Sequence, residues 1–279
     1  MDDTLRENGA AIREQIIEQN PLIHHITNLV VTHSTANATL AWGASPVMAD
    51  APEEVAEMTS AAQALVLNIG TLTSSTLAAM RLAAAAATTA HIPIVLDPVG
   101  AGATVFRTQA AQRLAYEAHP QVIRGNAGEI AALCDREHQT RGVDTVGEVS
   151  LSNRIDLAQE AARRLHTVVA LTGATDVITD ADRILLVENG HPLLTRLTGT
   201  GCMATTAVAC FLATGAEPLL AAAAALGAYG LAAEQAAATA TGPGSFAIAL
   251  LDRIAALDTP ALRAGLRIRD ASSEEGESI

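Results

Sequence analysis

The stretch from residue 197 to residue 206 places a thiol beside a glycine-rich turn. It reads LTGTGCMATT, so that a cysteine follows directly after a Gly-Thr-Gly sequence. A tight glycine turn that opens a helix leaves backbone N–H groups free, and such groups bind anions such as phosphate. We therefore predict an anion hole, made of Gly199, Thr200, Gly201 and Cys202.

Further polar residues follow apolar runs that are typical of buried strands. In chain order, these strand-end residues are Asn68, Asp97, Arg124 and Thr172. Ligands bind beyond the carboxyl ends of the strands in an open parallel sheet, so we expect these side chains to face one ligand. Arg124 would clamp a phosphate or pair with a carboxylate. The chain has no GxxxxGK[ST] sequence, which excludes a P-loop as the phosphate cradle.

Two carboxylates suit a hard cation of the kind that assists phosphoryl transfer. Asp97 ends one predicted strand, and Glu129 lies one turn into the predicted helix 127–134, which follows the strand 121–123. Together they would hold the cation directly or through water. Two alternatives stay open. Asp97 precedes Pro98 and would then be an ordinary turn residue. Glu129 would then be a solvated carboxylate that is favourable in the first turn of a helix.

A second polar cluster lies in residues 21–54. It contains three histidines, His24, His25 and His33, whose spacing matches no metal-binding helix and which no cysteine joins. Capping or core hydrogen bonding is the more ordinary role of these histidines. Asn28, Asn37 and Met48 of the same segment would instead line a pocket for a small, neutral, partly apolar molecule.

The amino-acid composition indicates which binding partners and which cellular compartment to expect. The 279 residues carry a formal net charge of −13, which disfavours nucleic acid as a partner. Three cysteines in no CxxC pair disfavour disulfides and structural zinc. The polar N-terminus lacks a signal-peptide core, and the apolar stretch 219–233 is too short to span a bilayer. We expect a cytoplasmic protein that binds neither nucleic acid nor a membrane.

Strand-like and helix-like segments alternate along most of the chain. Apolar runs at 64–70, 93–96, 121–123 and 167–171 are separated by helical patterns, which indicates a mostly parallel sheet covered on both faces. The segment 176–191 predicts a hairpin at the edge of that sheet. We predict one three-layer α/β/α domain over residues 1–268 and an acidic, disordered tail over 269–279.

Seven motifs in this order resemble the hydroxyethylthiazole kinase family, of the ribokinase-like superfamily. They lie within residues 21–205 and at 242–246, and they read ITNLVVTHSTANATLAWGASPVMADAPEE, LVLNIGTL, VLDPVGAGAT, VIRGNAGEI, ALTGATDVI, LTGTGC and GPGSF. The resemblance implies ATP- and Mg²⁺-dependent phosphorylation of the primary hydroxyl of 4-methyl-5-(2-hydroxyethyl)thiazole, a thiamine precursor. It also implies a homotrimer with active sites between subunits.

The resemblance also assigns roles to individual residues. The thiazole would contact Met48 and Gly199, with Asn28 and Val30 nearby. ATP would be bound by Arg124, Thr172 and Asn126, and Mg²⁺ by Asp97 and Glu129.

The cysteine marks a departure from related kinases. Ribokinase-like enzymes commonly have GxGD at this loop, where the aspartate is the base for the substrate hydroxyl, whereas this chain has GTGC. We expect Cys202 to be the catalytic base, with a pKa that the helix end lowers and a neighbouring triphosphate raises. A small buried thiol without a role in proton transfer stays the alternative for this residue. Three alternatives stay open: a cysteine hydrolase or acyltransferase, a nucleotide-binding regulator, and a pyrimidine or sugar kinase.

Overall fold

A single sheet organises the chain, and its strands follow the order β2-β1-β3-β4-β5-β6-β7-β8-β9. The computed structural model describes residues 2–135 and 150–272. Neighbouring strands from β2 to β6 are parallel, and the pairs from β6 to β9 are antiparallel. The strands are β1 (Leu22–Ile26), β2 (Ser45–Val47), β3 (Ala64–Asn68), β4 (Ile94–Asp97), β5 (Val122–Asn126), β6 (Val168–Thr172), β7 (Asp176–Thr179), β8 (Ile184–Val187) and β9 (Ile268–Asp270).

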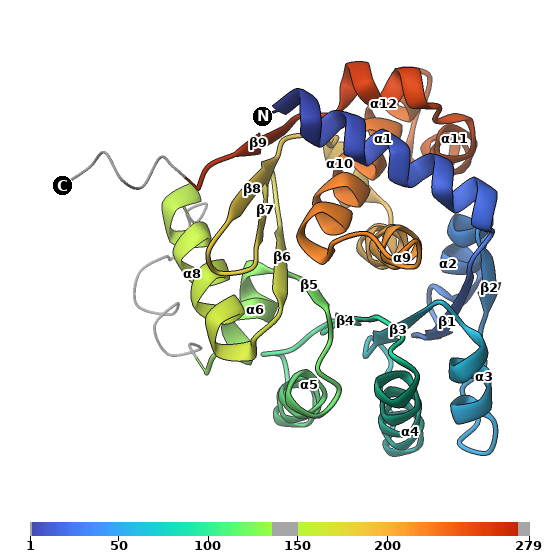
Figure 1. Cartoon of the computed structure of the whole chain (residues 1–279), viewed down its shortest axis with the longest axis vertical. Coiled ribbons are helices and arrows are strands. Elements are labelled where there is room, and N and C mark those ends of the chain that lie inside the picture. The colour runs from blue at the N-terminus through green and yellow to red at the C-terminus, as the bar shows by residue number, and fades with distance from the viewer. Residues whose placement is uncertain (1, 136–149, 273–279) are drawn as a thin grey trace.

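Helices cover both faces of this sheet, which makes three layers (Figure 1). The helices α4, α5, α6 and α8 pack on one face, and α1, α2, α9, α10, α11 and α12 pack on the other. Their bounds are α1 (Asp2–Gln19), α2 (Thr32–Ala41), α3 (Val55–Ala61), α4 (Ser74–Ala90), α5 (Val105–Glu117), α6 (Ala127–Leu133), α8 (Leu151–Leu165), α9 (Thr200–Leu212), α10 (Pro218–Ala237), α11 (Pro243–Ala256) and α12 (Thr259–Gly265), with a 3₁₀ helix η1 (Pro192–Arg196) before α9. The predicted α/β/α class with a mostly parallel sheet is confirmed.

The central strands alternate between two hydrophobic cores. In β3, Leu65 and Leu67 join the core under α4 and α5, whereas Val66 joins the core under α9 and α10. Successive side chains of a strand point to opposite faces of a sheet, and both faces here are covered. Continuous apolar runs such as ALVLN are therefore buried along their whole length.

The C-terminal end of the chain differs from the prediction. The hairpin β7–β8 forms, but β9 pairs with β8, so the hairpin does not lie at the edge of the sheet. A domain boundary at residue 268 and a tail from 269 are therefore too early, because Arg269 and Asp270 belong to β9. Residues 273–279 of the predicted tail lie outside the described residues.

One helix is longer than its apolar pattern indicated. The 20 residues of α10 are apolar enough to cross a membrane by length and composition, but 83% of the apolar window is buried inside the fold. This helix packs against α9 and α11 and contributes to the core on their face of the sheet. Burial between neighbouring helices accounts for its apolar composition.

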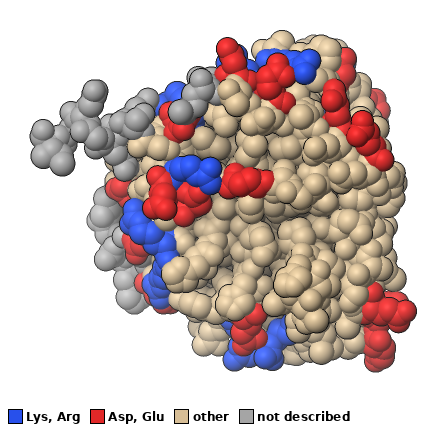
Figure 2. Space-filling view, viewed as in Figure 1, with Lys and Arg blue, Asp and Glu red and all other residues tan. Residues whose placement is uncertain are grey.

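Charged side chains gather in groups of mixed sign on one face of the molecule (Figure 2). Arg183, for example, pairs with Asp180 and Glu217, and Arg267 pairs with Glu234. A broad uncharged area lies beside these groups, over α9 and the strands β3 and β4. Every basic side chain of Lys or Arg type in this chain is an arginine, because the sequence contains no lysine.

Candidate active site

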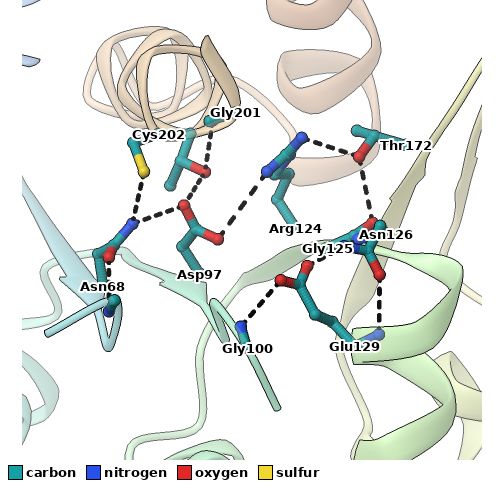
Figure 3. A network of polar contacts seen from close by, with 12 residues as sticks. Asn68, Asp97, Gly100, Arg124, Gly125, Asn126, Glu129, Thr172, Gly201 and Cys202 are labelled. Atoms are coloured by element: carbon teal, nitrogen blue, oxygen red, sulfur yellow. Dashed lines mark hydrogen bonds and ion pairs between the residues drawn. The ribbon is translucent and has the colours of Figure 1, made fainter. Parts of the chain in front are cut away.

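The strand-end residues converge under the N-terminal end of α9 (Figure 3). Alternation along each strand explains why they share a face, because all four lie two residues beyond a side chain of the core under α9. The four residues are Asn68, Asp97, Arg124 and Thr172, and the core side chains before them are Val66, Val95, Val122 and Ala170.

Arg124 lies at the centre of this group. Its Nη2 donates to the Thr172 hydroxyl at 2.8 Å, and its Nη1 is 3.9 Å from Oδ1 of Asp97. The guanidinium also lies against Gly201, where an added Cβ would be only 2.7 Å from Nη1. Gly201 therefore leaves the space that the guanidinium occupies at the start of α9.

Gly199 is required for two separate reasons. It has φ +85°, in the left-handed region that favours glycine, and an added Cβ would be 2.8 Å from Cγ1 of Val31. Because this N-cap is a glycine, no side chain caps α9. The Thr200 hydroxyl donates to the Leu194 carbonyl at 2.8 Å, so it ties the turn to η1.

Two sources of positive potential therefore meet at this turn. The N-terminus of a helix carries a partial positive charge, so a cationic side chain there is unfavourable unless an anion balances both. The nearest carboxylate, Asp97, is too far from Arg124 for a hydrogen bond. The arrangement favours a bound anion between Arg124 and the first turn of α9.

Cys202 is buried, and its sulfur accepts two amide N–H groups. Nδ2 of Asn68 lies 3.2 Å from Sγ, and Nδ2 of Asn28 lies 3.5 Å from it. Burial, followed by the charge of Asp97, raises the pKa of the Cys202 thiol to about 11, although both amides and Arg124 act in the opposite direction. In the protein without a ligand, burial and Asp97 thus set this pKa above the ordinary value of a thiol.

Asp97 is buried and only partly satisfied. Its Oδ2 accepts from Asn68 at 2.7 Å and from the Thr205 hydroxyl at 2.9 Å, whereas Oδ1 has no hydrogen-bond partner. Burial raises the pKa of the Asp97 carboxyl to about 6, with Glu129 acting in the same direction and Arg124, Thr205 and Asn68 opposing. The sequence did not assign a role to Thr205, which lies one helical turn after Gly201.

Glu129 and Asn126 are engaged in a capping box at the start of α6. The Asn126 side chain accepts from the Glu129 N–H at 3.0 Å, and Oε2 of Glu129 accepts from the Asn126 N–H at 2.9 Å. Oε1 of Glu129 accepts from the Gly100 N–H at 3.0 Å, which links this helix to the loop after β4. The side-chain oxygen of Asn126, predicted as an ATP ligand, is thus used as a helix cap.

The carboxylates leave room for a hard cation without forming a closed site. Oδ1 of Asp97 is an acceptor without a partner, and a carboxylate oxygen such as Oε1 of Glu129 can accept a second contact. Within the described residues, no three His, Cys, Asp or Glu side chains come together as a metal-binding group. The donor set therefore fits a cation that takes its remaining ligands from a substrate and water.

The predicted thiazole residues lie at the edge of the group. Asn28 follows β1, donates to Oδ1 of Asn68 at 2.8 Å and accepts from the Val30 N–H at 3.1 Å. The Val30 side chain is 64% exposed. Met48 follows β2, which is separated from β4 by β1 and β3, so it lies to the side of Asp97 within one chain.

Two of the histidines hold the loops of this region. His24 contacts the Thr59 hydroxyl at 2.8 Å and the Ala49 carbonyl at 2.7 Å, and Nε2 of His25 contacts the Thr39 hydroxyl at 3.1 Å. Burial lowers the pKa of both rings, to about 3 for His25. Neutral, hydrogen-bonded histidines agree with the structural role that the sequence favoured over zinc.

A cavity of about 680 Å³ opens beside Arg124 and the turn. Its wall includes the apolar side chains of Leu194 and Leu226, the ring of Tyr229, and Asp176, whose carboxyl accepts from the Gly173 N–H at 2.8 Å. Sequence reasoning missed Asp176 and Tyr229, because neither residue type signals a cavity without the fold. The cavity has the size of a ligand site for a cofactor-sized molecule.

The raised pKa of Cys202 gives a direct prediction for its reactivity. At pH 8, we expect iodoacetamide to alkylate Cys202 of the folded protein more than about 100-fold more slowly than free cysteine, because far less thiolate is present. Mass spectrometry of the Cys202 peptide over time measures this rate. The same peptide in the urea-unfolded protein is the control, and a folded-state rate within about tenfold of free cysteine would contradict the raised pKa.

Comparison with known proteins identifies the family. The sequence profile of the "Hydroxyethylthiazole kinase family" matches residues 13–260. The hydroxyethylthiazole kinase of Moorella thermoacetica is 54% identical over 94% of this chain and 98% of its own length, and that of Chloroflexus aggregans is 50% identical over 99% of both.

The structure of a hydroxyethylthiazole kinase from Pyrococcus horikoshii superposes with a TM-score of 0.86 at 42% identity, over 95% of this chain and 99% of that one. Bacillus subtilis pyridoxal kinase, solved as an ADP complex, shares the fold at a TM-score of 0.57 and 18% identity, over 77% of this chain and 91% of that one. The chain therefore belongs to the hydroxyethylthiazole kinase family, whose members phosphorylate the thiazole alcohol in thiamine biosynthesis and salvage.

Proposed function

We propose that this chain transfers the γ-phosphoryl group of ATP to the primary hydroxyl of 4-methyl-5-(2-hydroxyethyl)thiazole. The observation that carries the proposal is the meeting of Arg124 with the uncapped start of α9 at Gly201. Phosphoryl transfer depends mainly on positioning and on neutralising charge in the transition state. A cation and free backbone N–H groups that converge on one point supply both.

The cavity beside Arg124 is the proposed position of ATP. Thr172 and Arg124 lie on its wall, next to the turn 199–202, so a nucleotide bound there would direct its phosphates at the anion hole. The ADP-bound pyridoxal kinase of the same fold supports a nucleotide ligand for this architecture. The absence of lysine from the sequence leaves the phosphate contacts to arginine and backbone N–H groups.

Mg²⁺ is the proposed metal, held by Asp97 and Glu129. When bound, it would offset charge on the phosphate oxygens of ATP. The free Oδ1 of Asp97 and the partly exposed carboxylate of Glu129 support these two residues as its ligands. Arg124 lies close enough to Asp97 to limit the negative charge that the two carboxylates accumulate.

Cys202 remains the proposed catalytic residue, but as a neutral thiol. With a pKa of about 11 it is protonated at pH 8, so it cannot remove the hydroxyl proton before attack. The transition state is loose, and the hydroxyl therefore needs little early deprotonation. We propose that the thiol orients the hydroxyl by hydrogen bonding. The same high pKa disfavours the alternative of a cysteine hydrolase, which requires a thiolate nucleophile.

The activity and the role of the thiol are tested together. Purified protein should release ADP from ATP in the presence of Mg²⁺ and hydroxyethylthiazole, measured in a coupled assay. Cys202→Ala should lower kcat about tenfold, as expected for one lost hydrogen bond, and Cys202→Ser should restore most of it.

Two outcomes would contradict these expectations separately. No ADP release with the thiazole would overturn the assigned reaction. If both variants instead lost about 100-fold or more in kcat while the wild type turned over, Cys202 would be a true base, because general-base catalysis contributes losses of that size.

We further propose a cytoplasmic homotrimer in which the thiazole site lies between subunits. The side chains of Leu29 and Val30 are 81% and 64% exposed, and they precede Val31, which contacts Gly199. Exposed apolar side chains next to a polar site favour coverage by a partner. The predicted thiazole residue Met48 would then face the Gly199 turn of a neighbour.

Light scattering tests the trimer. The mass should be about three times the 28.7 kDa of one chain. Val30→Asp should dissociate the assembly, because it buries a charge in the interface, whereas the same change at exposed Val105 in α5 should not. A wild-type mass of one chain at micromolar concentration would contradict the proposal.

A further inference from the structure

We propose that Asn68 is a positioning residue for phosphoryl transfer, because it holds the Cys202 sulfur and the Asp97 carboxylate in one fixed arrangement. The inference rests on the proposed kinase function and adds a residue to its site. The Asn68 amide, at the end of β3, makes four hydrogen bonds. Figure 3 shows those to Asp97 and Cys202.

The orientation of the Asn68 amide follows from its surroundings. Oδ1 lies 2.8 Å from Nδ2 of Asn28 and 3.0 Å from the backbone N–H of Gly70. The Gly70 N–H can only donate, so Oδ1 must be the oxygen and Nδ2 must point the other way. Both acceptor positions of the oxygen are therefore used to hold the loops after β1 and β3.

Both N–H groups of Nδ2 then point at the reacting region. One donates to Oδ2 of Asp97 at 2.7 Å, and the other donates to Sγ of Cys202 at 3.2 Å. These two residues lie 105 positions apart in sequence, on β4 and α9. The Asn68 side chain contacts both of them. A shift of either group relative to the other would break one of the two bonds.

Asn68 is buried, with 2% of its surface exposed. Because both acceptor positions and both N–H groups of its amide are used within the protein, the side chain has none left for ATP or the thiazole. A residue that acts only by placing others should affect turnover more than substrate binding.

No other amino-acid type of this length offers an oxygen to Asn28 and Gly70 and two N–H groups to Asp97 and Cys202. Aspartate has the same shape and would still accept from Asn28 and Gly70, but it would present an oxygen to Asp97 and to the sulfur in place of two donors. Asn68→Asp thus keeps the contacts that hold the loops and removes those that hold the reacting groups. Asn68→Asp therefore tests the two donor contacts, and Asn68→Ala, which adds no charge, controls for the second carboxylate that aspartate places beside Asp97.

The experiment measures steady-state kinetics of Asn68→Asp in the full-length protein at pH 8. We expect kcat to fall at least about 30-fold, while KM for ATP and for hydroxyethylthiazole each change less than about threefold. Asn153→Asp, on the exposed surface of α8, is the matched control and should keep the wild-type kcat. A thermal melt of each variant confirms that it is folded.

A second variant covers the case in which Asn68→Asp does not fold. Asn68→Ala removes both donors without adding a charge, and we expect kcat to fall about tenfold with both KM values nearly unchanged. A kcat within about twofold of wild type in the folded variant would overturn the proposal, as would a loss confined to KM. Failure of the proposed function is distinguishable, because the wild type itself would then show no thiazole-dependent ADP release.

Discussion

The close approach of Arg124 to Gly201 is the contact on which the rest of the site depends. It places a guanidinium against the first turn of α9, whose N-cap is a glycine without a capping side chain. Cation and helix N-terminus repel one another unless an anion lies between them. The protein holds this unfavourable pair in place through the Thr172 hydroxyl and the nearby Asp97, so the proposed phosphate site would be formed before any phosphate binds. Preorganisation of this kind is what phosphoryl transfer demands of a protein.

The second constraint is the burial of Cys202 and Asp97 side by side. Low polarity disfavours the charged form of each group, and the carboxylate further disfavours the thiolate. Amide groups from Asn28 and Asn68 supply hydrogen bonds without adding charge, which suits a region where a highly charged substrate is expected. A thiol in this position stays neutral, whereas a second carboxylate would place two negative charges beside each other.

Several features of the fold and the site could be predicted from sequence because they depend on local pattern. The runs before Asn68, Asp97 and Arg124 indicated buried parallel strands, and alternation along those strands brings their end residues to one face. The pKa of Cys202 could not be predicted, since it depends on Asp97 from a distant segment and on burial by the whole fold. The pairing of β9 with β8 was missed for a similar reason, because three residues carry no periodicity and only the neighbouring strand specifies them. Glu129 was predicted as a cation ligand; its capping contact with Asn126 is local to the start of α6, but its contact with Gly100 appears only when the loop after β4 and α6 are brought together.

The proposed phosphate site consists of Arg124 and the start of α9, which meet in the space that Gly201 leaves. The most direct measurement is kcat/KM for ATP of Gly201→Ala, together with its melting temperature. Alanine favours a helix over glycine, so local stability should not fall, but its Cβ would lie 2.7 Å from Nη1 of Arg124 and displace the guanidinium. We predict a folded variant with a loss of at least about 100-fold in kcat/KM. A folded Gly201→Ala protein with kcat/KM within about threefold of wild type would contradict the account.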